Sequence, residues 1–532
     1  MPAPPRIVRR MLPSLLVLLT AAPAGAASTT LTILHVNDTH SRLEASGPRD
    51  ASLRGTLGGL EKAAAVIAAE KRTDPSALFV HAGDVFDGDL YFDVSLGVQE
   101  LLLLQDLGLD AMAVGNHEFH SGPDFLAGVL AEAWPVAGGV PLLGSNLDLS
   151  SYPLLTTWIE APFVKDVAGV KVGFLGMTTP YDLLERPAPV VIREDFAAAA
   201  AEGVSALHAQ GAQVVVCLAH LGLPLSRALA AQVVGIDVIV NGHDHVALAR
   251  PESVARAGGG TTLIVSAGEF YRWVGRLRLS FDGARVRLLD YALLDVDAAT
   301  PAFPLVSRAV FPLRQEIAAR FGDVYAPLAT ATATLSRESD HRFATRDSAI
   351  GNLVTDAYRA AGNTQIALEA TGLLDDDLQA GTVVAADVFH VMPYGTPELS
   401  TGGLAVRPFG LATFRMTGAN LVRGLETGLA IPDVFLQVSG LRFGYDSRAP
   451  EARRVLLDTV YVDGHALELD GAYTVTVNEG VLAFLPQMGI EVTDVRPLSV
   501  TAWEAVGRRI AALGVLEPVV SGRIRDVAAT GD

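Results

Sequence analysis

The chain has 532 residues, half of them hydrophobic, with 51 glycines, 29 prolines and a formal net charge of −19. Single cores seldom grow beyond about 250–300 residues, so this length favours two globular domains with many turns. The acidic balance argues against a nucleic acid polymer as partner, because binding to a phosphate backbone needs a positive face. It leaves small anionic substrates open, since a bound metal reverses the local field.

Residues 1–27 have the pattern of a secretory signal peptide. An arginine-rich start precedes an apolar core over residues 11–22 and small residues at 24–27. No later stretch is apolar enough to suggest a membrane span. The single cysteine, Cys217, lies in an apolar run and is expected to be buried. We therefore expect an exported protein, periplasmic or extracellular, without internal disulfides.

From residue 31 to about residue 294, short apolar runs alternate with helical segments. We expect helices over residues 60–71 and 94–107, and a closing hairpin over 277–294. The expected strands cover residues 31–36, 77–81, 111–114, 170–175, 213–218, 238–240 and 262–265. Such alternation is typical of an α/β domain whose strands are buried on both faces. We place this domain at residues 28–300.

A linker and a second domain are expected to follow. Helical spacing over residues 306–321 comes after a short, proline-bearing stretch, which predicts a linker helix within residues 301–325. The second domain, over residues 326–528, should contain a helix at 350–361 and many short strands. The predicted architecture is thus two α/β domains joined by one helix.

Five loops that follow expected strands begin with residue types that bind metals. Ligands bind outside the carboxyl ends of strands in open α/β sheets, so side chains from these loops can share one cleft. A single Asp-x-His or Gly-Asp is usually a turn, but five such loops in this order predict a metal site. Mixed imidazole and oxygen ligands suit Zn, Mn, Fe or Co. The candidate ligands are Asp38, His40, Asp84, Asn116, His220, His243 and His245.

These motifs resemble the secreted 5′-nucleotidase/UDP-sugar hydrolase family of calcineurin-like metallophosphoesterases over most of the chain. The resemblance implies a first domain of two β-sheets flanked by helices, a C-terminal substrate-binding domain and two divalent metal ions. One ion would be held by Asp38, His40, Asp84 and His245, and the other by Asp84, Asn116, His220 and His243. His117 would stabilise charge on the phosphoryl group. Two such ions can clamp a hydroxide and a phosphate oxygen for in-line displacement.

One position near His117 departs from the family pattern. The family usually has Gly-Asn-His-Glu-Phe-Asp, whereas this chain has His120 in the last place. An imidazole can accept a hydrogen bond from His117, but it does not stabilise an imidazolium as a carboxylate does. Glu118 and Asp124 are alternative carboxylate partners. Two readings stay open, a compensated site and a variant with reduced or altered activity.

The second domain gives weaker indications of substrate. By its resemblance to the family segment that presents a base-stacking aromatic, Tyr394 would stack on a nucleobase; the alternative is a core tyrosine. Arg342 and Arg346 are candidate phosphate contacts, with surface arginines as the alternative. Asp375 stands where the family has a phosphate-binding arginine, and Glu479 stands where it has a second stacking aromatic.

The predicted function is that of an exported two-metal phosphohydrolase that releases phosphate from nucleotides. Its partner would be a small phosphoester, and no obligate protein partner is evident. One alternative keeps the metals and changes the substrate to a UDP-sugar, a cyclic nucleotide, a sugar phosphate or a thiosulfonate. The other is a non-catalytic secreted binding protein, against which the full ligand set argues. In the family pattern, a hinge near residues 300–325 would bring substrate to the metals.

Overall fold

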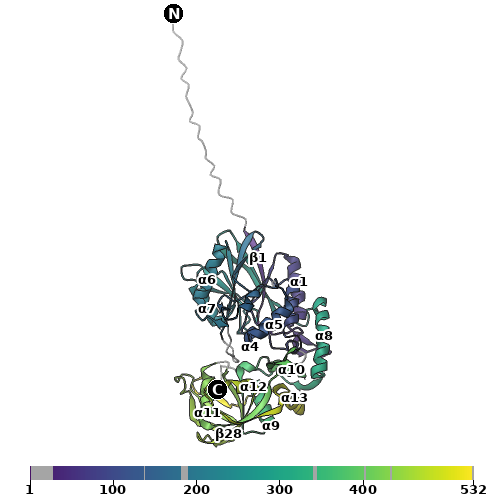
Figure 1. The fold of residues 1–532 in the computed structure, drawn as a ribbon, viewed down its shortest axis with the longest axis vertical. Coiled ribbons are helices and arrows are strands. Elements are labelled where there is room, and N and C mark those ends of the chain that lie inside the picture. The colour runs from purple at the N-terminus through teal and green to yellow at the C-terminus, as the bar shows by residue number, and fades with distance from the viewer. Residues whose placement is uncertain are drawn as a thin grey trace.

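The structure is a computed structural model that describes Met1 and residues 28–136, 138–180, 190–339, 344–400, 403–431 and 434–529. It has two lobes, the first drawn in purple to teal and the second in green to yellow (Figure 1). The expected signal peptide lies outside the described residues apart from Met1. Within those residues, no helix has the length and apolarity that a membrane crossing requires.

The first lobe is built on two sheets. One has the strand order β17-β16-β1-β4-β5-β6-β8, and the other has the order β14-β15-β13-β12-β10-β9. Their strands are β1 (Thr29–Val36), β4 (Leu78–His81), β5 (Ala111–Ala113), β6 (Leu142–Leu143), β8 (Ile159–Glu160), β9 (Phe163–Val167), β10 (Val170–Thr178), β12 (Val214–His220), β13 (Val238–Gly242), β14 (Glu252–Ala255), β15 (Thr261–Val265), β16 (Trp273–Phe281) and β17 (Val286–Asp295). The expected hairpin over 277–294 is confirmed as β16 and β17, which pair antiparallel.

Strand β12 shows why apolar runs form the centre of this lobe. All seven of its residues are buried. Val216 belongs to the core between the two sheets, whereas Cys217 belongs to the core under helices α6 (Phe196–Ala209) and α7 (Leu223–Gln232). Successive side chains of a strand point to opposite faces, so a strand covered on both sides must be apolar throughout. The expected burial of Cys217 is confirmed.

Helices α1 (Leu60–Thr73), α3 (Val98–Asp106) and α5 (Pro123–Ala133) contribute to the core that includes the other face of the first sheet. The single helix predicted over residues 94–107 is wrong, because α2 (Leu90–Ser95) ends before α3 begins. Leu96 and Gly97 between them both have positive φ. A Cβ at Gly97 would lie 2.4 Å from the ring of Phe86, so the break needs glycine at this place.

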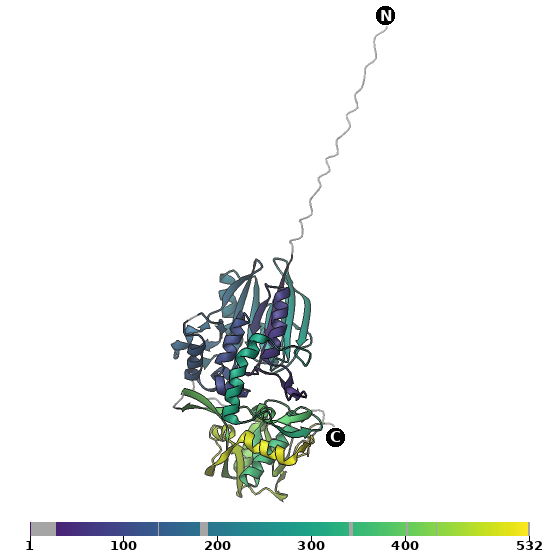
Figure 2. The same ribbon diagram turned by 90° about the vertical axis from the view of Figure 1, so that its right-hand side faces the viewer.

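The expected linker helix is α8 (Pro304–Phe321), which packs against α1 and α2 and runs from the first lobe toward the second (Figure 2). Arg320 near its end donates hydrogen bonds to the carbonyl oxygen of Asp93 in the first lobe and to that of Val406 in the second. The helix therefore joins the lobes through hydrogen bonds as well as through the chain.

The second lobe is also mixed α/β. Its largest sheet has the order β24-β19-β28-β23-β29. Its principal helices are α9 (Ala349–Gly362), α10 (Ala385–Val391), α11 (Gly418–Ala430), α12 (Glu479–Phe484) and α13 (Ala502–Leu513). Its principal strands are β18 (Pro327–Ala331), β19 (Ile366–Ala370), β20 (Gly381–Val384), β21 (Gly395–Ser400), β22 (Gly403–Pro408), β23 (Gly410–Thr417), β24 (Leu436–Ser439), β25 (Leu441–Tyr445), β26 (Val455–Val462), β28 (Ala472–Asn478), β29 (Thr493–Thr501) and β31 (Ile524–Asp526). The predicted helix at 350–361 is confirmed as α9.

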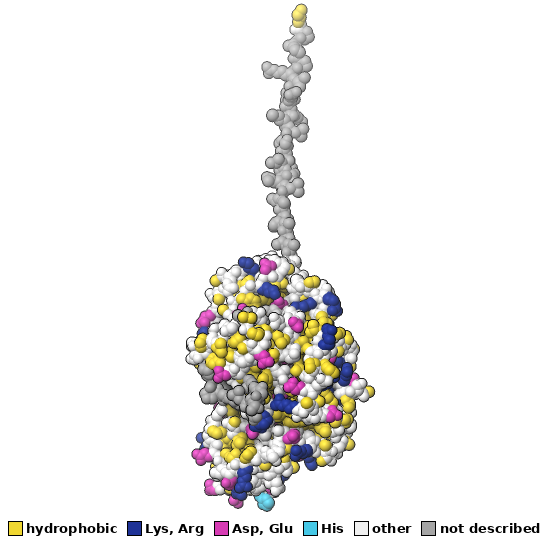
Figure 3. All heavy atoms as spheres, turned by 45° about the vertical axis from the view of Figure 1, so that its right-hand side comes forward, with side chains coloured by type: hydrophobic (Ala, Val, Ile, Leu, Met, Phe, Trp, Pro, Cys, Tyr) yellow, Lys and Arg dark blue, Asp and Glu magenta, His cyan; other side chains and the backbone are white. Residues whose placement is uncertain are grey.

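Charges of both signs and hydrophobic side chains are interspersed over the face shown in Figure 3. This face carries no continuous positive stripe among its described residues, as the acidic composition leads one to expect.

Candidate metal centre

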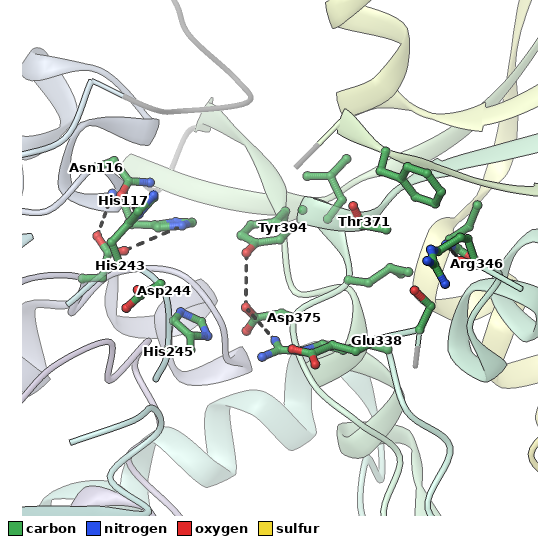
Figure 4. Close-up of a pocket in the computed structure, with 18 of the residues that line it drawn as sticks. Asn116, His117, His243, Asp244, His245, Glu338, Arg346, Thr371, Asp375 and Tyr394 are labelled. Atoms are coloured by element: carbon green, nitrogen blue, oxygen red, sulfur yellow. Dashed lines mark hydrogen bonds and ion pairs between the residues drawn. The ribbon is translucent and has the colours of Figure 1, made fainter. Parts of the chain in front are cut away.

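The predicted ligands all lie at the carboxyl ends of parallel strands. Strands β1, β4 and β5 are parallel neighbours in the first sheet, and β12 and β13 are parallel neighbours in the second. Their ends face the second lobe, and Figure 4 shows Asn116, His243 and His245 on one side of a pocket between the lobes. The fold therefore brings together seven residues that are spread over more than two hundred positions: Asp38, His40, Asp84, Asn116, His220, His243 and His245.

Asp84 lies at the middle of this arrangement. Its Oδ2 is 2.9 Å from His220 Nε2 and 4.0 Å from His40 Nε2. On the side of His220, the Oδ1 of Asn116 is 3.1 Å from His220 Nε2 and 3.2 Å from His243 Nδ1. One carboxylate thus borders two groups of ligand atoms, as a residue that bridges two cations must.

The second group surrounds His40. The Nε2 atoms of His40 and His245 are 3.2 Å apart, and His245 Nε2 is 4.0 Å from Asp38 Oδ1. His40 Nδ1 donates to the carbonyl oxygen of Phe86 at 3.1 Å, and His245 Nδ1 lies 2.5 Å from Glu269 Oε2. Hydrogen bonds from the outer nitrogens leave both Nε2 atoms facing each other. A proton or a divalent cation between the two Nε2 atoms would satisfy both of them.

The backbone of the ligand loops is strained. Non-glycine residues seldom adopt positive φ, and each such residue costs about 1–3 kcal/mol unless its surroundings enforce it. Such strain concentrates at functional sites. Five of the seven predicted ligands have φ from 50° to 90°: Asp38, His40, Asp84, His243 and His245. The strained backbone of these loops therefore directs the ligand side chains toward one another.

Burial and mutual charge set the protonation of these groups. Burial lowers the pKa of His40 to about 4 and that of His243 to about 3, so both imidazoles are neutral and can act as ligands. Burial alone would lower the pKa of His220, but the Asp84 carboxylate raises it to about 9. In the metal-free protein a proton therefore lies between His220 and Asp84. A divalent cation would replace this proton, which is how metal binding couples to pH.

Glu118 holds two of the metal loops in place. Its Oε1 accepts a hydrogen bond from the backbone N–H of Val85 at 2.7 Å, and its Oε2 accepts one from Gly115 at 2.6 Å and one from Asp84 at 3.2 Å. The Glu118 side chain therefore binds backbone N–H groups rather than His117. Asp124, the other carboxylate considered for His117, accepts a hydrogen bond from Tyr152 instead.

The carboxylate partner of His117 is Asp87, which the sequence reasoning did not assign. His117 Nδ1 lies 2.9 Å from Asp87 Oδ2, and His120 Nδ1 lies 2.7 Å from the same oxygen. Asp87 is 4% exposed. Burial would raise its pKa, but the two imidazoles hold the pKa well below the usual range, so it is a carboxylate at neutral pH. His117 therefore has an anionic partner although position 120 is a histidine.

The pocket of Figure 4 extends from the metal site into the second lobe and encloses about 750 Å³. Tyr394 lines it and stacks against His117, with ring centroids 5.6 Å apart and an interplanar angle of 19°. Its proposed contact with a nucleobase stays a prediction. Arg346 lines the far end, 3.7 Å from Asp526. Arg342 lies outside the described residues.

The two positions that depart from the family pattern in the second lobe have different surroundings. Asp375 lines the pocket and faces the metal-site histidines. Glu479 instead accepts hydrogen bonds from Arg407 and from the backbone N–H of Gly410, both at 2.9 Å. Only Asp375 is placed to meet a bound substrate.

Both domains of the chain are similar in sequence to known proteins. A model of the calcineurin-like phosphoesterase family matches residues 31–247, and one of the 5′-nucleotidase C-terminal domain matches residues 327–483. The chain is 27% identical to a mouse 5′-nucleotidase, over 99% of this chain and 96% of that protein. It is also 27% identical to a trifunctional nucleotide phosphoesterase of Bacillus subtilis, over 93% of this chain, which spans only 35% of that longer protein.

Among solved structures, a 5′-nucleotidase precursor from Thermus thermophilus superposes with a TM-score of 0.80 at 28% identity, covering 94% of this chain and 99% of that one. The similarity extends over both lobes. It accounts for the two-sheet first domain and for the mixed α/β second domain.

Proposed function

We propose that this chain, which belongs to the 5′-nucleotidase family with a calcineurin-like phosphoesterase domain and a 5′-nucleotidase C-terminal domain, is a two-metal hydrolase that releases phosphate from nucleotides. The observation that supports it most is the position of Asp84. Its carboxylate lies between two groups of ligand atoms, one around His220 and one around His40. Nucleotides are the substrates that the relatives' names give, and the pocket beside the ligands has room for more than phosphate.

The residues fit a pair of divalent cations. Imidazole, carboxylate and amide oxygen suit Zn, Mn, Fe or Co. The ligand atoms of Asp38, His40 and His245 lie within 4.8 Å of one another, and so do those of Asp84, His220 and His243. One ion would contact Asp38, His40, Asp84 and His245, and the other Asp84, Asn116, His220 and His243. When bound, such ions polarise a phosphoryl oxygen and lower the pKa of water towards neutrality.

The remaining side chains supply orientation and charge. His117 stands beside the ligands, with its Nε2 4.0 Å from Asp84 Oδ2, where it can stabilise charge on a phosphoryl group. Asp87 fixes the ring of His117 and stabilises its protonated form. Tyr394 covers one face of that ring and excludes water from it.

The test is hydrolysis of a phosphoester panel after chelation and reloading with Mn or Zn. AMP, ribose 5-phosphate and bis-p-nitrophenyl phosphate separate nucleotides, sugar phosphates and diesters. We expect the highest kcat/KM for AMP, loss of activity without metal, and a fall of at least about 100-fold in Asp84→Ala. Equal activity in wild type and Asp84→Ala would contradict the metal chemistry, and no preference for AMP would contradict the nucleotide assignment.

A further inference from the structure

Asp87, His117 and His120 form a third group of potential ligand atoms beside the two groups of the metal centre. The Oδ2 of Asp87 lies 2.9 Å from His117 Nδ1 and 2.7 Å from His120 Nδ1. The three ligand atoms all lie within 4.8 Å of one another. One bond to a carboxylate is enough to orient His117, so the convergence of a second imidazole on the same oxygen needs a further explanation.

The ring of His117 separates this third group from the metal centre. Its Nε2 lies on the side of Asp84, 4.0 Å from Oδ2, whereas its Nδ1 faces Asp87. His117 and His120 are three residues apart on the short helix α4 (His117–His120), and residues at this spacing share one face of a helix. A cation at the two Nδ1 atoms would therefore be distinct from the ions that Asp84 borders.

The third group is enclosed, but it is reachable from the pocket of Figure 4. Asp87 is 4% exposed and His120 is 5% exposed. Both histidines line the pocket. Tyr394 stacks on His117, and its ring centroid lies 5.9 Å from that of His120. These contacts hold both rings in place, so an ion that enters from the pocket meets ligands that lose little freedom on binding.

We propose that Asp87, His117 and His120 form a third, zinc-binding site whose occupation inhibits the protein. Two imidazoles and one carboxylate with a fourth position open to water are a common ligand set for Zn²⁺. Imidazole ligands also favour Zn²⁺ over Mn²⁺. The ion would take the place of the hydrogens that the two Nδ1 atoms donate to Asp87.

Occupation of the third site would disturb His117 in two ways. Ligand atoms about 2.0–2.1 Å from a tetrahedral ion are roughly 3.3 Å apart, so the ring of His117 must move by about half an ångström. Its Nδ1 could also no longer hold a proton, which prevents the ring from becoming an imidazolium. The zinc site itself goes beyond the proposed function, and only the inhibition rests on that function.

The test counts the zinc ions bound per chain at micromolar free zinc in wild type and in His120→Asn. The asparagine amide can still donate a hydrogen bond to Asp87, but it is a weaker zinc ligand than an imidazole. We expect three ions per wild-type chain and two per His120→Asn chain. With manganese at the same free concentration, neither protein should hold more than two.

Activity gives a second readout, taken as the ratio of kcat in excess zinc to kcat at two zinc equivalents. This ratio is formed within each protein, so a lower basal kcat of the variant does not affect it. We expect kcat to fall about tenfold or more in wild type, because His117 is displaced from the phosphoryl group. In His120→Asn the ratio should stay within about twofold of one.

His390→Gln is the matched control. His390 is also buried, at 6% exposed, and its Nε2 lies 3.0 Å from Asp89 Oδ2. Among the described residues, it belongs to no group of three potential ligands. Glutamine places its amide near the position of Nε2, so this variant also replaces a buried imidazole bonded to an aspartate. We expect it to keep the third zinc ion and the wild-type inhibition ratio.

Each outcome decides the proposal. The site would be overturned if wild type bound only two zinc ions, or if His120→Asn retained a third, as zinc on surface histidines would produce. Asp87→Asn is a second variant that should also bind two, so poor folding of His120→Asn leaves the test intact. Equal inhibition of wild type and His120→Asn would overturn the inhibitory role. If no phosphoester were cleaved, the proposed function would fail, whereas the zinc count would still decide the third site.

Discussion

Asp87→Asn should lower kcat because it removes the anionic partner of His117. The replacement has nearly the same shape, but it loses the charge that faces His117 Nδ1 at 2.9 Å and His120 Nδ1 at 2.7 Å. A hydrogen bond to a charged group contributes about 1.5–3 kcal/mol, which corresponds to roughly 10- to 150-fold in rate if the whole contribution is made in the transition state. We expect a fall in kcat within that range and little change in KM.

The assay compares two monoesters with the same phosphoryl group and different leaving groups. If His117 also assists the departing oxygen, the fall should be larger for an alkyl phosphate than for p-nitrophenyl phosphate, whose leaving group needs little help. The double variant Asp87→Asn/His120→Asp returns a carboxylate to the other side of the ring. We expect the kcat of the double variant to be about tenfold higher than that of Asp87→Asn alone.

Metal content, measured on the same samples, is the control. Asp87 is not among the predicted ligands, so two ions per chain should remain in Asp87→Asn. The reasoning would be refuted by a kcat within about twofold of wild type, or by a loss that adding metal restores.

Two further predictions concern groups behind the ligands. Glu269→Gln removes the charge that fixes His245 Nδ1, and we expect metal affinity to fall about 10- to 100-fold in a chelator competition, whereas an unchanged affinity would contradict that role. Burial raises the pKa of Glu100 to about 8 from 4.5, so the wild type loses stability as pH rises through this interval. Glu100→Gln should match wild type at pH 4.5 and be more stable by at most about 5 kcal/mol at pH 9 in urea unfolding; a pH-independent difference would refute this.

The fold of the first domain was predictable because its strands are buried on both faces. Runs such as Val214–Leu218 need no alternation of polar residues to be recognised, and turn residues mark their ends. The break between α2 and α3 was not predictable from spacing alone. It depends on the packing of Gly97 against Phe86. The local sign is the glycine itself, and a lone glycine does not tell a helix break from a glycine tolerated inside a helix.

The same distinction separates the ligands from the groups that support them. Ligands follow strands, so their order along the chain and the parallel topology together place them in one cleft. Glu269 follows β15 in the chain, but nothing in its immediate sequence marks it as the partner of His245. The carbonyl oxygen of Phe86, which orients His40, has no sequence signal at all because every residue has one.

The histidine at position 120 illustrates why a missing motif residue is weak grounds for inferring a lost function. What His117 needs is an anionic oxygen near its Nδ1, and this is a requirement on a place in space rather than on a place in the sequence. The loop after β4 and the short helix α4 (His117–His120) face each other, so either can supply the carboxylate. With Asp87 in that role, an aspartate at position 120 would put two buried carboxylates beside one imidazole and raise the pKa of at least one. A histidine at 120 avoids this repulsion and itself bonds to Asp87. We therefore propose that the two positions compensate each other, which the kcat of Asp87→Asn tests.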